Sequence, residues 1–179
     1  AGVNVERKIK ALEVVRNKFL LGAYTALRVS DFNYLRDVHI DGDYFRVTTQ
    51  KTGAHVVIPI HPVIRRIIDS GFDISTPITD QKINEHIKEV ARMAGITQLV
   101  EGTKYIQHRA VVGFFPKCDL ITTHTARRSA ATNMYKAGIP TISIMRITGH
   151  TTEKSFMKYI KITSEENAEL MARNAFFMG

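Results

Sequence analysis

The sequence predicts a mainly helical α+β domain with one small three-stranded antiparallel β-sheet. Apolar residues recur at helical spacing along most of the chain, which favours amphipathic helices. Between Asp37 and Ile60 the apolar period changes to two, as in β-strands. The chain has 179 residues, of which 44% are hydrophobic, so it can bury a core of its own. We therefore expect a single domain over residues 1–179.

The N-terminal third is predicted to contain two helices and the sheet. A long amphipathic helix is expected over residues 5–26, because apolar side chains recur there every three or four positions. Ser30 is the predicted N-cap of a short second helix. Three strands follow within residues 37–60, where β-branched and aromatic residues alternate between the turn sequences DGD and QKTG.

The middle of the chain is predicted to hold two more helices and a long irregular segment. The helices, 61–71 and 79–95, each end at a glycine, which accepts the left-handed backbone of a helix terminus. Residues 97–122 have no clean period and contain two glycines and a proline, so we expect irregular backbone there. Short strands are expected only around 111–115.

The C-terminal third is predicted to be helical throughout. Glycine and proline separate the first two helices, and a Thr-x-x-Glu capping box precedes the last one. The expected helices are 123–137 with Thr123 as cap, 140–147, one that starts at Thr152 and contains Tyr159, and 163–174.

The chain is strongly basic. Its 25 Lys and Arg against 17 Asp and Glu give a net charge of +8. Such a surface attracts polyanions, so DNA or RNA is the first partner expected. A membrane surface is the weaker alternative, since no apolar run approaches the roughly 18 residues of a membrane span. The single cysteine, Cys118, excludes an internal disulfide and favours a cytoplasmic protein.

An H-x-x-R pair stands at the start of the helix expected over 123–137. His124 and Arg127 would share one face of that helix and could converge on one group. The pair alone is a weak signal, because two solvated residues give the same pattern. It gains weight from further polar residues at Arg28, Lys51, His150 and Tyr159.

This ordered set resembles the catalytic domain of the tyrosine recombinases, also called phage-type integrases. All six positions of the family pattern are filled, and the acidic residue that follows the first arginine by three is present as Asp31. The resemblance spans residues 20–161. Two positions depart from it: Ala126 stands where a leucine is common inside H-x-x-R, and Thr148 replaces a leucine before Gly149.

The chemistry of these residue types agrees with the resemblance. Two guanidiniums, Arg28 and Arg127, would hold the charge that develops on the phosphate oxygens. A phenol with a reference pKa near 10 costs about 4 kcal/mol to ionise at pH 7, unless nearby cations favour the phenolate. His124 would help to move the proton of the attacking oxygen, and His150 would donate a hydrogen bond to the phosphate. The resemblance implies that Lys51 protonates the leaving 5′-oxygen.

Tyr159 is the preferred nucleophile on spacing as well. Tyr135 would lie about 16 Å along the same helix from His124, at 1.5 Å per residue. Two chain breaks separate Tyr159 from that helix, so it can fold back toward the H-x-x-R pair.

The resemblance implies a DNA strand transferase that forms a 3′-phosphotyrosine. It further implies duplex DNA as substrate, integration or excision of a mobile element, association with the nucleoid, and no need for ATP, metal or another cofactor. A homotetramer on DNA, assembled through the helix expected at 163–174, is also implied. Family members usually carry a helical core-binding domain before the catalytic one, so we expect this chain to be the catalytic part alone.

Three other functions remain open from the sequence. A non-catalytic DNA-binding regulator would explain the charge and the helices, although not the six-residue set. A type IB topoisomerase would use nearly the same groups to relax supercoils without choosing a site. A metal-dependent nuclease is the least favoured, because the sequence has no H-E-x-x-H motif and no clear carboxylate cluster.

Overall fold

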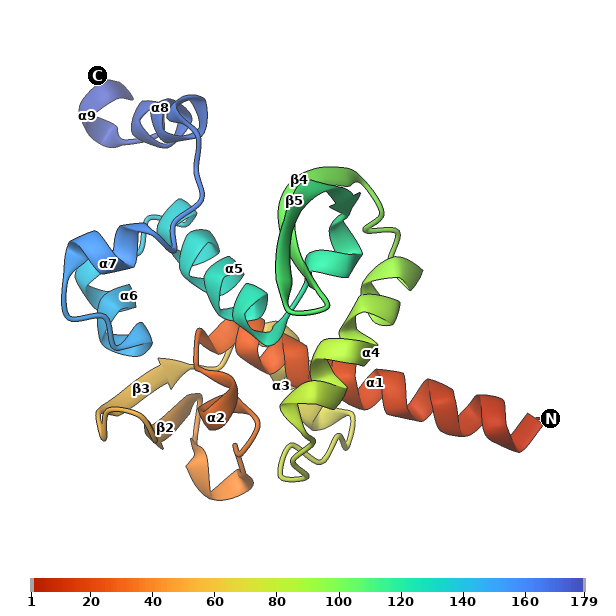
Figure 1. Cartoon of the computed structure of the whole chain (residues 1–179). Coiled ribbons are helices and arrows are strands. Elements are labelled where there is room, and N and C mark those ends of the chain that lie inside the picture. Colours follow the sequence, from red (N-terminus) through yellow and green to blue (C-terminus); the bar gives the residue numbers. More distant parts are fainter. Residues whose placement is uncertain (1, 179) are drawn as a thin grey trace.

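The computed structural model describes residues 2–178, and the predicted fold class is confirmed. Helices surround a long N-terminal helix, with a small sheet on one side and a hairpin on another (Figure 1). The N-terminal elements are α1 (Gly2–Thr25), α2 (Val29–Phe32), the 3₁₀ turn η1 (Asp37–His39), β1 (Ile40–Asp41), β2 (Tyr44–Thr48), β3 (His55–Pro59) and α3 (Pro62–Asp69). The remaining elements are α4 (Asp80–Met93), β4 (Leu99–Ile106), β5 (Arg109–Pro116), η2 (Lys117–Leu120), α5 (Thr123–Lys136), α6 (Thr141–Thr148), α7 (Glu153–Met157), α8 (Ser164–Ala172) and α9 (Ala175–Met178).

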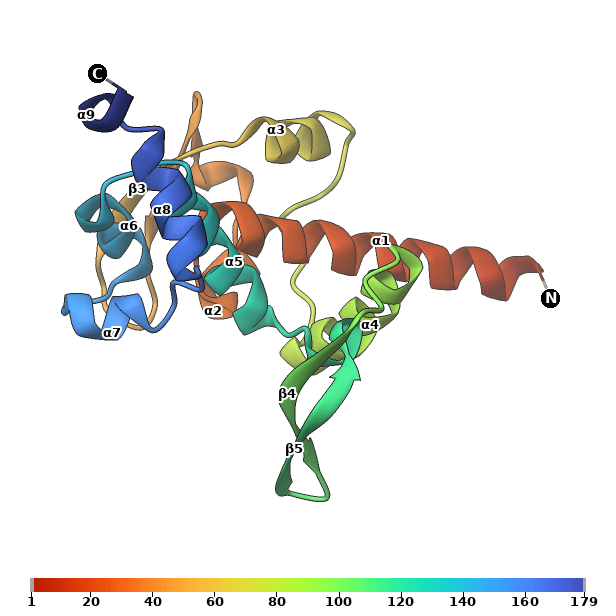
Figure 2. The ribbon, with the colours of Figure 1, turned by 90° about the horizontal axis from the view of Figure 1, so that it is seen from above.

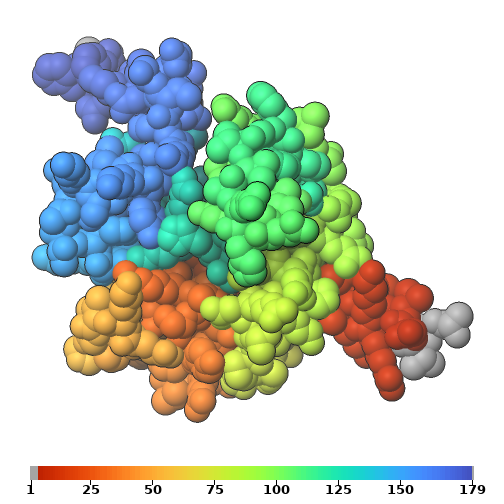
Figure 3. Space-filling view, in the orientation of Figure 1, coloured from red at the N-terminus to blue at the C-terminus, as the bar shows by residue number. Residues whose placement is uncertain are grey.

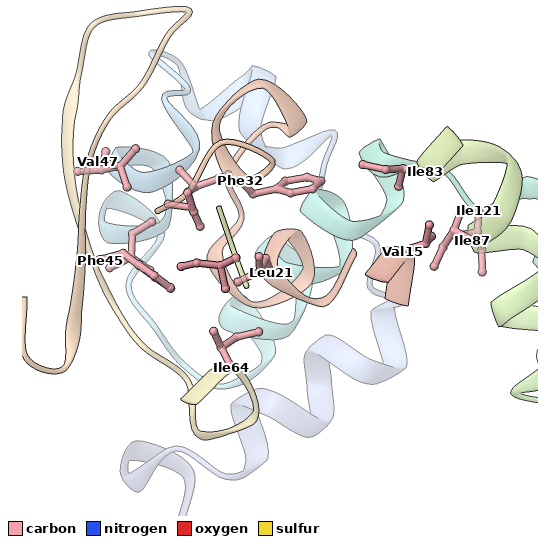
Figure 4. Close-up of a cluster of buried hydrophobic side chains, with 14 of the residues drawn as sticks. Val15, Leu21, Phe32, Phe45, Val47, Ile64, Ile83, Ile87 and Ile121 are labelled. Carbon is pink, nitrogen blue, oxygen red and sulfur yellow. The ribbon is translucent and has the colours of Figure 1, made fainter. Parts of the chain in front are cut away.

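The predicted three-stranded sheet is antiparallel in the order β1-β2-β3. Side chains of β2 and β3 alternate between exposed and buried, as their period of two predicts. The buried face contributes Phe45 and Val47 to the main core, together with Leu21 of α1 and Phe32 of α2 (Figure 4). The sheet is thereby fixed to the C-terminal end of α1.

Helix α5 packs directly against α1, and two small residues permit the approach. A Cβ added at Gly22 would lie 2.7 Å from Cε1 of Phe32 and 3.2 Å from the Cβ of Ala126. Ala126 is fully buried at this crossing. A leucine at position 126 would therefore need more space than this crossing offers, which explains the departure from the family pattern.

A second apolar cluster holds the C-terminal elements together. Ala131 of α5, Ile144 of α6, Phe156 of α7 and Ile160 are buried against one another. Beyond this cluster, α8 and α9 project from the body as a separate lobe (Figure 3). A capping box between Thr163 and Glu166 starts α8 as predicted.

The prediction for residues 97–122 was wrong. Strands β4 and β5 form a regular antiparallel hairpin, paired from Leu99 with Pro116 to Ile106 with Arg109. The hairpin extends away from the helical body (Figure 2). Its length exceeds the short strands that were expected around 111–115.

Three predicted helix positions also need correction. Helix α2 begins at Val29 with Arg28 as its N-cap, so Ser30 lies inside the helix. Thr122 rather than Thr123 caps α5. Helix α7 ends at Met157, so Tyr159 lies in the turn that follows it. Cys118 is buried.

Candidate active site

The structure brings five of the six predicted side chains together at one site, and Tyr159 is one of the five. Its ring centroid lies 4.4 Å from that of His150 and 5.1 Å from that of His124, both edge-on. The guanidinium carbon of Arg127 lies 5.8 Å from the same centroid. Arg28 completes the group, because its Nη1 lies 3.7 Å from the position that a Cβ at Gly149, next to His150, would occupy. Its charge lowers the pKa of both histidines and of Arg127. These residues come from the N-cap of α2, from α5, and from the segments after α6 and α7 (Figure 1).

Arg127 is buried on α5 and is held by two backbone carbonyls. Its Nη1 donates to the carbonyl oxygen of Ala26 at 2.6 Å, and its Nη2 donates to the carbonyl of Thr148. Its Nε is also buried and has no hydrogen-bond partner among residues 2–178. Burial, followed by the charge of Arg28, lowers the pKa of Arg127. The guanidinium is therefore fixed in position, and at least one donor is left over.

Arg28 is placed by an unusual end of α1. Ala26 has a φ of 57°, a left-handed conformation that costs a residue with a Cβ about 1–2 kcal/mol. Its carbonyl accepts the hydrogen bond from Arg127, which helps to offset this cost. Arg28 then reaches the loop after α6, where its Nη1 lies 3.7 Å from the position that a Cβ would occupy if Gly149 were replaced by a larger residue. Gly149 itself has a φ of 62° and closes α6.

Asp31 is buried beneath the turn between β2 and β3. Its Oδ1 accepts the backbone N–H of Gln50 at 2.8 Å, and its Oδ2 is buried with no partner among the described residues. The charge of Asp31 raises the pKa of Arg127, against the stronger effects of burial and of Arg28. Asp31 thus both anchors the turn and supports the cationic state of Arg127.

Lys51 stands in this same turn and is the one predicted residue that the structure leaves apart. Its side chain is exposed and forms no hydrogen bond or ion pair with residues 2–178. The Oγ1 of its neighbour Thr52 lies 3.9 Å from the position that a Cβ at Gly149 would occupy. The turn therefore borders the site, while the Lys51 side chain points into solvent.

Both histidines have lowered pKa values. Burial lowers the pKa of His150 from 6.5 to about 4, and Arg127, Arg28 and His124 add to the effect. Burial also lowers the pKa of His124, with Arg128, Arg127 and Arg28 contributing. Both rings are accordingly neutral at pH 7 when no anion is bound.

Tyr159 is held by the apolar residues on either side of it. Phe156 and Ile160 are buried in the second cluster, while Tyr159 between them stays partly exposed. The hydroxyl of Thr132 donates to the Tyr159 carbonyl at 3.2 Å and accepts the N–H of Lys161 at 3.3 Å. The rival Tyr135 packs against the second cluster instead. The role of Thr132 could not be predicted from the sequence, because a threonine whose hydroxyl binds backbone atoms belongs to no sequence motif.

Two negative observations concern only the part of the chain that the structure describes. Between residues 2 and 178, no three His, Cys, Asp or Glu side chains gather in a way that could hold a metal ion. In the same range, every helix is either too short or too polar for a membrane span.

The comparison with protein families gives the class of this helical domain, because residues 5–166 match the model described as "Phage integrase family", the tyrosine recombinases. The chain belongs to this family.

Solved structures share the fold at low sequence identity. XerA recombinase matches with a TM-score of 0.64 at 17% identity, over 97% of this chain and 63% of that one. The lambda integrase catalytic core matches with a TM-score of 0.54 at 16% identity, over 81% of this chain and 88% of that one. A lambda integrase tetramer bound to a Holliday junction matches with a TM-score of 0.56 at 15% identity, over 87% and 46%. The chain thus spans less than two thirds of the XerA chain. A comparison with curated proteins gives no significant match.

Proposed function

We propose that this chain is the catalytic domain of a site-specific DNA recombinase that cleaves and rejoins strands through a 3′-phosphotyrosine at Tyr159. The observation that carries the proposal is that the ring of one tyrosine lies close to two histidines and to a buried arginine. The family membership makes integration or excision of a mobile element the expected biological setting. Such a protein would act in the cytoplasm, at the nucleoid.

Arg127 and Arg28 would bind the non-bridging oxygens of the scissile phosphate. Carbonyls already hold Arg127, so little reorganisation is needed when charge develops in the transition state. Guanidiniums stay charged and offer several N–H donors in a fixed geometry. This preorganised positive charge would replace a metal ion in stabilising the phosphorane.

Tyr159 would attack the phosphorus and form the covalent intermediate. Ionising a phenol at pH 7 costs about 4 kcal/mol, and the positive charge of Arg127 beside the ring would lower that cost. His124 would help to remove or return the proton, and His150, once it is protonated, would hydrogen-bond the phosphate. Lys51 would protonate the departing 5′-oxygen, which requires DNA to draw its exposed side chain inward.

The reaction would need neither ATP nor a metal. Each step exchanges one phosphodiester for another, so most of the bond energy is retained in the phosphotyrosine. Cleavage that continues at full rate in EDTA would agree with this, and cleavage abolished by EDTA would contradict it.

A suicide duplex, nicked so that the cleaved end diffuses away, tests the proposal. The wild-type protein should form a protein–DNA adduct that survives SDS, and the Tyr159→Phe protein should form none. Tyr135→Phe is the matched control and should form the adduct at close to the wild-type rate. An adduct that persists in Tyr159→Phe would refute the assignment, whereas no adduct from any protein would favour a non-catalytic DNA-binding regulator.

A type IB topoisomerase would give the same adduct, so the substrate must separate the two activities. Relaxation of any supercoiled plasmid without recombination would favour the topoisomerase. Recombination confined to plasmids that carry one defined site would favour the recombinase.

We further propose that duplex DNA assembles this protein as a tetramer through its C-terminal helices. The lobe of α8 and α9 exposes Met171, Phe176, Phe177 and Met178, which a neighbouring protomer could cover. Replacing Phe176 and Phe177 by serine should reduce the tetramer on DNA, as measured by analytical ultracentrifugation, with unchanged circular dichroism. A wild-type protein that stays monomeric on DNA would rule out this assembly.

A further inference from the structure

Thr148 occupies a central position in the site without being one of the six predicted residues. It is fully buried at the C-terminal end of α6. Its carbonyl accepts the hydrogen bond from Arg127, and its hydroxyl oxygen lies 2.8 Å from Nδ1 of His150. One residue therefore contacts both a guanidinium and a histidine of the site.

The proton of the Thr148 hydroxyl is already assigned by its surroundings. Its Oγ1 lies 2.9 Å from the carbonyl oxygen of Ile144, one turn earlier in α6. Two oxygens at this separation repel each other unless a proton lies between them, and a threonine has only one to give. The same back-bond to the preceding turn is a common arrangement of threonine in helices.

The hydrogen bond to His150 must then run from the ring to the hydroxyl. Because the Thr148 proton points at Ile144, its oxygen can only accept, and Nδ1 of His150 must carry the hydrogen. In the neutral ring the lone pair is then on Nε2, for which no described residue supplies a hydrogen-bond partner. A leucine at position 148 could not impose this tautomer.

We propose that Thr148 is a positioning residue that holds His150 as the Nδ1–H tautomer and so presents Nε2 to the reaction centre as a proton acceptor. This inference rests on the proposed function for its catalytic consequence. As Oη of Tyr159 bonds to phosphorus, its O–H bond breaks and the proton passes to Nε2 of His150. The P–O5′ bond breaks at the same time, and the leaving oxygen takes a proton from Lys51.

The same arrangement then serves the charged ring. Protonated His150 keeps its Nδ1–H on Thr148 and donates its new Nε2–H to a non-bridging phosphate oxygen. In the rejoining step the 5′-hydroxyl attacks the phosphorus and gives its proton to Lys51, the P–Oη bond breaks, and the proton on Nε2 returns to Oη of Tyr159. The charged and titratable groups around the ring are Arg28, Arg127, His124 and Tyr159.

The ring nitrogens of His150 can be observed directly by ¹⁵N NMR of the free protein, whether or not it cuts DNA. A His150→Gln spectrum identifies the His150 signals. The wild type should show a protonated Nδ1 and an unprotonated Nε2 at neutral pH. Thr148→Val, which keeps the shape and removes the acceptor, should shift the population toward the Nε2–H tautomer, and Thr148→Ser should restore Nδ1–H.

A matched control separates this effect from a loss of stability. Thr25 is also buried, and its hydroxyl makes the same back-bond, to the carbonyl of Leu21 at 2.7 Å. Thr25→Val should therefore leave the His150 tautomer unchanged. A wild type with Nε2–H, or a Thr148→Val protein with unaltered ring signals, would overturn the proposal.

Adduct formation tests the catalytic consequence. Thr148→Val should slow it about ten- to hundredfold, the value of a lost hydrogen bond to a charged group, and Thr148→Ser should recover most of the rate. In a His150→Gln background, Thr148→Val should cost less than about twofold, since the two residues act through one interaction. An equal loss in both backgrounds would refute the coupling. If the wild type forms no adduct, the proposed function fails, while the tautomer measurement still decides the role of Thr148.

Discussion

Replacing His150 by glutamine should remove part of the acid sensitivity of the fold. Burial, assisted by Arg127, Arg28 and His124, lowers the pKa of His150 from 6.5 to about 4. Between these two values the unfolded chain binds a proton that the folded chain does not. The free energy of unfolding is therefore highest above pH 6.5 and falls as the pH falls toward 4.

The size of this effect follows from the same pKa values. When the pH is lowered from about 7.5 to 5, a full shift of the His150 pKa to about 4 would reduce the free energy of unfolding by about 2 kcal/mol. Because the side chain is only half-buried, solvent screening reduces the expected contribution to about 1 kcal/mol. The pKa of His124 is also lowered, so the variant should keep some acid sensitivity.

Urea unfolding at the two pH values measures the difference. The wild type should lose about 1 kcal/mol more than His150→Gln when the pH is lowered. His108→Asn is the control, because His108 is exposed in the hairpin turn and asparagine tolerates its left-handed backbone. This control should behave as the wild type does. If His150→Gln loses as much stability as the wild type, His150 is not held neutral in the folded state.

Three further predictions concern packing, the leaving group and DNA binding. Ala126→Leu should lower the free energy of unfolding, measured in urea, by about 1–3 kcal/mol, because Ala126 is buried directly against Gly22 where α5 crosses α1. Ala168→Leu, on the exposed face of α8, is the control and should not lower it. Lys51→Ala should slow cleavage about 10²- to 10⁴-fold. A sulfur in place of the leaving 5′-oxygen should restore the rate, and no recovery would exclude Lys51 as the acid. Duplex binding in gel shifts should be weak and should fall steeply with salt, by about 0.9 log units per log unit of salt for each phosphate contacted; tight binding that ignores salt would contradict this.

The hairpin shows where sequence patterns failed. Gly102 and Gly113 face each other in β4 and β5, and glycine within a run weakens any strand prediction. A Cβ at Gly102 would lie 2.5 Å from Cδ1 of Leu120, so any other residue there would require the Leu120 side chain to move. The turn is made by Gln107 and His108, both with positive φ although neither is glycine. The strands and the turn therefore lack the residue patterns that usually predict a hairpin.

The long helices and the sheet were predictable because burial sets their periodicity directly. The six-residue set was found from order and residue type, although spacing along a chain cannot say which side chains meet. Lys18 illustrates what remained hidden: it lies on α1, fully buried, and donates to the carbonyls of Asn33 and Ile74 at 2.9 and 2.6 Å. Burial lowers its pKa to about 8, against the attraction of Asp73. A buried lysine that binds backbone has the same sequence signature as a solvated one.

The most direct measurement is a crystal structure of the protein trapped on a suicide duplex. We expect the phosphorus of the 3′-phosphate to be bonded to Oη of Tyr159, with Arg28 and Arg127 both bound to its non-bridging oxygens. A phosphorus bonded to another residue, or guanidiniums of Arg28 and Arg127 that bind elsewhere, would contradict it.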